Sequence, residues 1–234
     1  MRAVTGVLAL ATWAVAISTA SSASLVTNGS FETPLTTPGS YTNYAVGANL
    51  GGWTVVGPPG ATDAVSIVDY RFQQNGFNFI AQDGNQWVDL AGQDANAPYG
   101  LQQILPTVSG QAYNLSFWVG NFFDPDGFFG ISTTINVTLN GMLFLTAINT
   151  DSSNPDNDWK NFFASFVATG PTTLAFYNGD LSTDYHSGLD NVSVTEVSAV
   201  PLPAALPLFA SALIGGGVAA WRRKRKLKAE PIAA

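Results

Sequence analysis

Cysteine is absent from this 234-residue chain, and histidine occurs only once, at His186. The lack of cysteine excludes thiol catalysis, disulfide crosslinks and thiolate metal sites. A domain of about 175 residues can bury enough surface to fold without disulfides. Neither a Gly-x-Ser-x-Gly segment nor a zinc signature accompanies His186, so we expect it to be a surface-loop residue. A Ser-His-Asp arrangement assembled from distant residues is the alternative.

Basic residues are also scarce, and they are unevenly placed. The chain has nine Lys and Arg against 16 Asp and Glu, which gives a net charge of −7. Seven of the nine lie near the two ends, so residues 24–197 keep only Arg71 and Lys160 beside 15 acidic side chains, a net charge of −13. Such a surface argues against a nucleic-acid partner and favours divalent cations.

Residues 1–23 have the pattern of a secretory signal peptide. A positive charge at Arg2 precedes an apolar core from Val7 to Ile17, and small residues follow up to Ser24. This order is typical of an export signal, and cleavage after Ala20 or Ala23 fits equally well. An uncleaved anchor is the alternative, but the apolar core is short for a membrane span of about 20 residues.

Residues 198–228 combine a proline motif, an apolar segment and a basic end. The apolar run from Ala204 to Trp221 is at the lower limit for a membrane-spanning helix. The basic residues that follow it are Arg222, Arg223, Lys224, Arg225, Lys226 and Lys228. Because basic residues that flank a span stay in the cytoplasm, we expect residues 24–197 to lie outside the membrane and the basic end inside.

The motif before the span consists of Val200, Pro201, Leu202, Pro203 and Ala204. With the apolar segment and the basic end, it resembles a PEP-CTERM sorting signal, in the variant that has leucine where glutamate is usual. The resemblance implies an exported protein of a Gram-negative bacterium. It would be anchored first in the inner membrane, then cut by an exosortase and moved to the cell surface or the extracellular space. An ordinary single-pass anchor is the alternative.

Between these ends, short apolar or alternating runs are separated by Gly, Pro, Asn and Asp, and no helical period is sustained. The predicted strands are Leu25–Glu32, Gly52–Val56, Val65–Tyr70, Gln86–Ala91, Gly100–Leu105, Tyr113–Gly120, Ser132–Leu139, Met142–Ile148, Trp159–Ala168, Thr172–Tyr177 and Leu189–Val197. Asn140-Gly141 lies between two of them and indicates a tight hairpin. Regular short strands with turn signals predict an all-β, antiparallel β-sandwich over residues 24–197.

Several segments of this region carry a second resemblance. They are Asn28–Glu32, Gly52–Trp53, Gly84–Leu90, Gly100–Gln103, Tyr113–Phe117 and Leu189–Val194. Together they resemble the galactose-binding-like jelly roll of DUF642-type and family 4/22-type carbohydrate-binding modules. The resemblance implies that the first and last strands lie close together. It also implies that Glu32 and Asp190 hold a structural Ca²⁺ with backbone carbonyls, with Asn28 and Ser30 beside them. Turn hydrogen bonds made by Glu32 and Asp190 are the alternative.

One loop is both acidic and aromatic. Asp124 and Asp126 are further candidates for calcium, although the loop lacks the full spacing of an EF-hand, and solvated turns are the alternative. The same loop contains Phe122, Phe123, Phe128 and Phe129. A loop with four phenylalanines must fold over the sandwich or meet a partner.

Exposed aromatic rings are the residues that stack against sugar rings, so the candidates for a ligand site are aromatic. They are Phe128, Phe129, Tyr99 and Tyr185, and packing within the protein is the alternative for each. The sequence therefore predicts a non-catalytic surface or matrix protein with a calcium-stabilised domain that binds polysaccharide. A structural protein that acts through protein contacts is one alternative, and a glycosidase or esterase is another.

Overall fold

The computed structural model describes residues 23–93, 98–125, 127, 129–151, 156–180 and 186–197. They belong to a compact unit that ends at Val197. No helix in this part of the chain is long and apolar enough to cross a membrane. Residues 1–22 of the expected signal peptide, the proline motif, the expected span and the basic end all lie outside the described residues.

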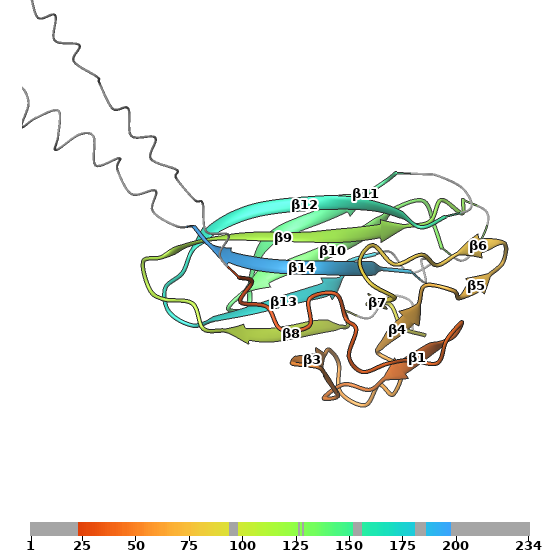
Figure 1. The fold of residues 1–234 in the computed structure, drawn as a ribbon, viewed down its shortest axis with the longest axis horizontal. Coiled ribbons are helices and arrows are strands. Elements are labelled where there is room, and N and C mark those ends of the chain that lie inside the picture. Colours follow the sequence, from red (N-terminus) through yellow and green to blue (C-terminus); the bar gives the residue numbers. More distant parts are fainter. Residues whose placement is uncertain are drawn as a thin grey trace, which may run out of the picture. The chain divides into compact units, whose positions relative to one another are not determined.

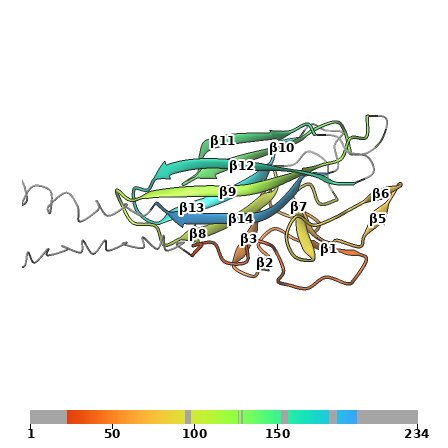
Figure 2. The same cartoon turned by 45° about the horizontal axis from the view of Figure 1, so that its top comes forward.

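The described residues form two antiparallel sheets and a small hairpin, and Figures 1 and 2 show the sheets as two layers. The strands are β1 (Tyr41–Tyr44), β2 (Asn49–Leu50), β3 (Trp53–Val56), β4 (Val65–Asp69), β5 (Gln73–Gln74), β6 (Phe77–Asn78), β7 (Gln86–Asp89), β8 (Gly100–Leu105), β9 (Ala112–Asn121), β10 (Thr133–Leu139), β11 (Met142–Asn149), β12 (Asp158–Val167), β13 (Thr172–Asn178) and β14 (Gly188–Glu196). The first sheet has the order β1-β4-β7-β14-β9-β12, and the second has the order β11-β10-β13-β8-β3-β2. The hairpin β5–β6 forms a separate two-stranded sheet.

The predicted two-sheet antiparallel sandwich is confirmed, and its core follows the alternation seen in the sequence. On β9, the side chains of Tyr113, Leu115, Phe117 and Val119 are buried between the sheets, while the residues between them face outward. Burying each of these side chains stabilises the fold by about 1.5–3 kcal/mol. The alternation therefore fixes which face of the strand meets the second sheet.

The first predicted strand, Leu25–Glu32, is wrong. The segment runs beside β14, and the amide of Leu25 donates a 2.7 Å hydrogen bond to the carbonyl of Val194. However, Asn28 and Phe31 both adopt φ +55, which interrupts an extended strand. The two ends of the described domain nevertheless lie side by side, as the resemblance implied.

Candidate functional site

Two carboxylates that are distant in the sequence hold the same loop. Glu32 Oε1 accepts hydrogen bonds of 2.7 and 2.9 Å from two backbone amides of loop 82–86. Asp190 Oδ2 accepts two more, of 2.9 and 3.0 Å, from amides of the same loop. We call Glu32, Asp190 and loop 82–86 the clasp. The clasp joins the N-terminal segment and the last strand to the loop that leads into β7.

Asp190 carries the most perturbed charge of the clasp. Its side chain is fully buried, and Oδ1 accepts a third amide hydrogen bond, from Asn191 at 2.7 Å. Burial raises the pKa of the Asp190 carboxyl to about 8; the charge of Asp83 adds to this, and the amide hydrogen bonds oppose it. The ion pairs among the described residues are Arg71–Asp69 and Lys160–Asp151. Neither pair reaches the clasp, so no basic side chain of the described residues pairs with its carboxyl groups.

The neighbours predicted for a metal site have other partners here. The Ser30 hydroxyl donates to Asp83 Oδ2 at 2.6 Å. The Asn28 amide group donates to backbone carbonyls, the nearer at 2.6 Å, and so stabilises its own turn. Gly84 has φ +70, and a Cβ atom there would lie 2.3 Å from Glu32 Oε1. A side chain at this position would adopt a strained left-handed backbone and would push the Glu32 carboxylate away from loop 82–86.

The clasp offers part of what Ca²⁺ needs. No three His, Asp or Glu side chains in the described ranges lie close enough to hold a metal ion by themselves. The hydrogen bonds above use one oxygen of Glu32 and not the other, and neither ion pair of the described residues includes Glu32 or Asp190. Calcium takes 6–8 oxygens and accepts carbonyls among them. The donor set fits calcium if Glu32 and Asp190 supply the side-chain ligands and carbonyls complete the shell.

Apart from the main core between the sheets, a second cluster of buried side chains, mostly aromatic, covers part of the outer face of the first sheet. We call it the second aromatic cluster. Its buried members are Val68, Phe77, Phe79, Trp87, Phe122 and Phe129. Phe79 lies at its centre, with its ring centroid 4.6 Å from that of Phe122, 4.9 Å from Phe72 and 5.6 Å from Phe129. Phe122 and Phe129, two of the four phenylalanines of the loop, therefore pack onto the sheet. For these two residues, the prediction that the loop folds over the sandwich is confirmed.

The prediction that His186 is a surface-loop residue is wrong. Its imidazole is fully buried against the second aromatic cluster, 4.6 Å from the ring of Phe122 and 5.2 Å from Trp87. Neither ring nitrogen has a hydrogen-bond partner, and burial lowers the pKa of the imidazole to about 3. His186 is therefore a neutral packing residue at ordinary pH. The polar residues around it in the sequence suggested a loop, but the contacts that bury it come from distant segments.

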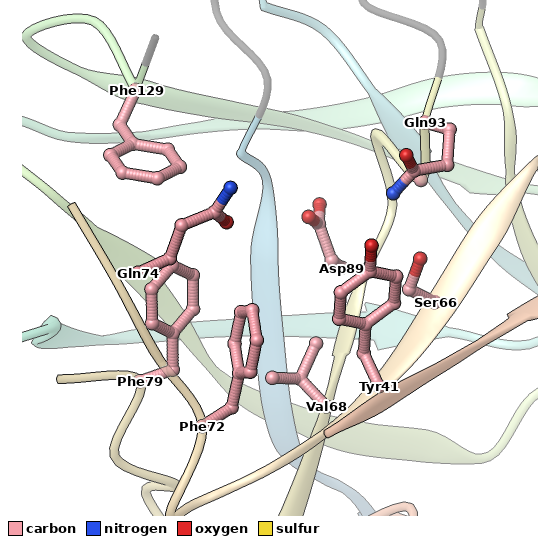
Figure 3. A pocket seen from close by; sticks show the side chains of 10 residues that line it. Tyr41, Ser66, Val68, Phe72, Gln74, Phe79, Asp89, Gln93 and Phe129 are labelled. Atoms are coloured by element: carbon pink, nitrogen blue, oxygen red, sulfur yellow. The ribbon is translucent and has the colours of Figure 1, made fainter. Parts of the chain in front are cut away.

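A pocket of about 340 Å³ opens beside this cluster (Figure 3). Its aromatic lining residues are Tyr41, Phe72, Phe79 and Phe129. Its polar lining residues are Ser66, Gln74, Asp89 and Gln93. The volume lies at the lower end of the range of about 300–1,000 Å³ for small-molecule sites, and the mixture of rings with a few polar groups is typical of them.

Asp89 is the carboxylate of the pocket. Oδ1 accepts hydrogen bonds of 2.9 Å from the amides of Ala91 and Ser187, which fix its orientation. Only 8% of the residue is exposed, and burial raises the pKa of the carboxyl to about 7 although both amides oppose the rise. Asp89 therefore exchanges a proton near neutral pH at the wall of an open cavity.

The predicted ligand residues lie in different places. Phe129 lines the pocket, whereas Tyr99 is 7% exposed and packs in the main core between the sheets. Asp124 Oδ2 accepts a long hydrogen bond, 3.4 Å, from the amide of Phe129 within its own loop. The other predicted ligand and metal residues, Asp126, Phe128 and Tyr185, lie outside the described residues.

Sequence reasoning missed the hairpin that forms one side of the pocket. Asn75 and Gly76 adopt φ +52 and +84, and the predicted hairpin at Asn140-Gly141 has nearly the same values, +52 and +80. The same dipeptide signal was therefore present between Phe72 and Phe79. The strands on either side of it have only two residues each, which is too short for an alternation to be recognised.

Comparison with known proteins finds distant structural likenesses and no family. No protein-family model and no curated protein matches the chain. A solved structure titled as TmCBM61 in complex with β-1,4-galactotriose has 19% identity and a TM-score of 0.45, over 75% of this chain and 99% of its own. The CBM22-1 xylan-binding domain from Paenibacillus barcinonensis has 17% identity and a TM-score of 0.43, over 78% and 100%. A cleaved adhesin domain of Lys-gingipain from Porphyromonas gingivalis has 16% identity and a TM-score of 0.47, over 68% and 100%.

Proposed function

We propose that this protein is a non-catalytic carbohydrate-binding protein and that the pocket on the outer face of the first sheet is its binding site. The observation that carries the proposal is the composition of the pocket, where four aromatic rings lie beside hydroxyl, amide and carboxyl groups. A sugar ring presents C–H groups on its faces and hydroxyls around its edge. Aromatic rings pack against the faces, and polar side chains fix the hydroxyls.

The same geometry opposes a hydrolase. Glycoside hydrolysis needs two carboxyl groups on either side of the bond that breaks. Among the described residues that line the pocket, only Asp89 carries a carboxyl group. The histidine is buried and neutral, and no hydrogen bond joins it to a serine or an acid. The pocket is therefore equipped to hold a ligand rather than to cleave it.

The binding site is tested with a survey of polysaccharides and a pair of tyrosine variants. We expect the purified protein to bind at least one polysaccharide, and Tyr41→Ala to weaken that binding about fivefold, since the loss of one stacking ring costs about 1 kcal/mol. Tyr70→Ala is the matched control, because Tyr70 is 39% exposed against 38% for Tyr41 and does not line the pocket. Isothermal titration calorimetry measures both. Equal affinities of the two variants would show that the polysaccharide binds outside the pocket. Binding to no polysaccharide would reject the proposed carbohydrate-binding function.

We further propose that the sandwich is a galactose-binding-like jelly roll, and that the protein is exported and released from the membrane at its proline motif. The pattern of residues 1–23 and 198–228 supports export. We expect the mature protein from cells to lack the peptide Trp221–Lys228. Mass spectrometry of the membrane and released fractions checks this, and recovery of that peptide in the mature form would show a permanent anchor instead.

A further inference from the structure

The aromatic side of the pocket is a continuous arc of rings. The ring centroids of Tyr41 and Phe72 lie 5.1 Å apart, those of Phe72 and Phe79 4.9 Å, and those of Phe79 and Phe129 5.6 Å. All four rings line the same cavity. The rings pack edge to face or tilted against one another, with interplanar angles of 76°, 59° and 78°. The face of an aromatic ring carries partial negative charge, so a ring of the arc that turns its face to the cavity attracts a cation.

Asp89 lies across the pocket from most of this arc. Figure 3 shows its carboxyl group pointing into the space, with Phe72, Phe79 and Phe129 on one side and Ser66, Gln93 and Tyr41 on the other. The two amide hydrogen bonds to Asp89 use Oδ1 and do not use Oδ2. A ligand that fills the pocket therefore meets a carboxyl oxygen that can accept a charge-assisted hydrogen bond.

The described residues supply no cation at this place. The cations of the described residues, Arg71 and Lys160, pair with Asp69 and Asp151 at 2.8 and 2.9 Å and do not line the pocket. The charge of −13 over residues 24–197 also repels anionic polymers and attracts cationic ones. A uronic acid or a sulfated sugar is thus disfavoured by both the wall of the pocket and the whole domain.

We propose that the pocket takes an amino sugar with a free ammonium group, presented by a polysaccharide whose amino groups are not acetylated. The ammonium group lies within the aromatic arc and donates to Asp89, while Gln74, Gln93 and Ser66 contact the hydroxyls of the same sugar. This inference rests on the proposed carbohydrate-binding function and names its ligand class. A free organic ammonium compound has the same cationic chemistry, so the experiment below separates the two sources.

The test compares four probes on the full-length protein by calorimetry: glucosamine tetramer, its N-acetylated form, the unsubstituted glucose tetramer, all β-1,4-linked, and choline. We expect the glucosamine tetramer to bind at least tenfold tighter than the N-acetylated and glucose tetramers, and choline to bind no better than they do. Asp89→Asn keeps an oxygen that can accept both amide hydrogen bonds but removes the charge, so it should abolish this preference. Asp151→Asn makes the same change of net charge at an exposed side chain outside the pocket and should leave the preference intact.

Each outcome decides the inference. Equal binding of the three tetramers, or a preference that survives Asp89→Asn, overturns it and leaves the proposed function standing. If choline alone binds, the ammonium group does not come from a sugar, and the inference is overturned. Binding of none of the probes also overturns it, and the polysaccharide survey then decides the proposed function separately. If Asp89→Asn does not fold, as judged by circular dichroism, Phe72→Leu replaces it, because loss of one ring of the arc should also lower the preference.

Discussion

Replacing Phe79 with alanine is expected to lower the free energy of unfolding by about 3–5 kcal/mol, the usual cost of removing a buried aromatic side chain. Phe79 is 4% exposed and lies at the centre of the second aromatic cluster, in ring contact with Phe72, Phe122 and Phe129. For a domain of this size the change corresponds to a fall in melting temperature of roughly 10 °C. Thermal unfolding followed by circular dichroism measures it.

The same substitution should remove the proposed carbohydrate binding, because Phe79 also lines the pocket. The matched control is Phe163→Ala on β12, where the ring is 64% exposed, so that we expect a loss below about 1 kcal/mol and unchanged binding. A stable Phe79→Ala protein would show that the cluster is not needed to hold the β5–β6 hairpin on the first sheet. Retained binding in that variant would place the sugar site outside the pocket.

Calcium is expected to raise the melting temperature by about 5–10 °C over that in a chelator. A ligand that binds only the folded state at 100 times its Kd stabilises that state by about 2.7 kcal/mol. We propose Glu32 and Asp190 as the side-chain ligands, since both carboxyl groups hold the same loop and neither is paired with a basic side chain of the described residues. Scanning calorimetry in calcium, in magnesium and in EDTA measures the effect, and magnesium should give less because it demands a more rigid octahedral shell.

Glu32→Gln is the informative variant for this prediction. Glutamine keeps one oxygen for the two amides of loop 82–86 but loses the charge, so the variant should fold and lose the response to calcium. Lys160→Ala, at a surface ion pair, should keep the full response. If the unmodified protein melts at one temperature in calcium and in EDTA, amide hydrogen bonds alone hold the clasp.

Most strands could be predicted from the sequence because strand and turn patterns depend on residues that are neighbours in the chain. Alternation on β9 and the Asn140-Gly141 turn are set by neighbouring residues, and both predictions are confirmed. The prediction for Leu25–Glu32 failed because Asn28 and Phe31 turn into the left-handed region, where the segment gains contacts with β14 and with Trp53 that the sequence does not show. The short hairpin at Asn75-Gly76 was missed because two-residue strands carry no period.

The class of fold, the acidic character of the domain, the absence of thiol chemistry and the expectation of export are all established by the order and composition of the amino acids. These follow from composition and from patterns within one segment. Tertiary structure alone decided the site. The pocket joins Tyr41, Phe72, Asp89 and Phe129, which belong to four separate segments and meet only when the hairpin and a loop fold onto the first sheet. His186 became a buried neutral ring for the same reason, since burial is a property of what packs around a residue and not of its neighbours in the chain.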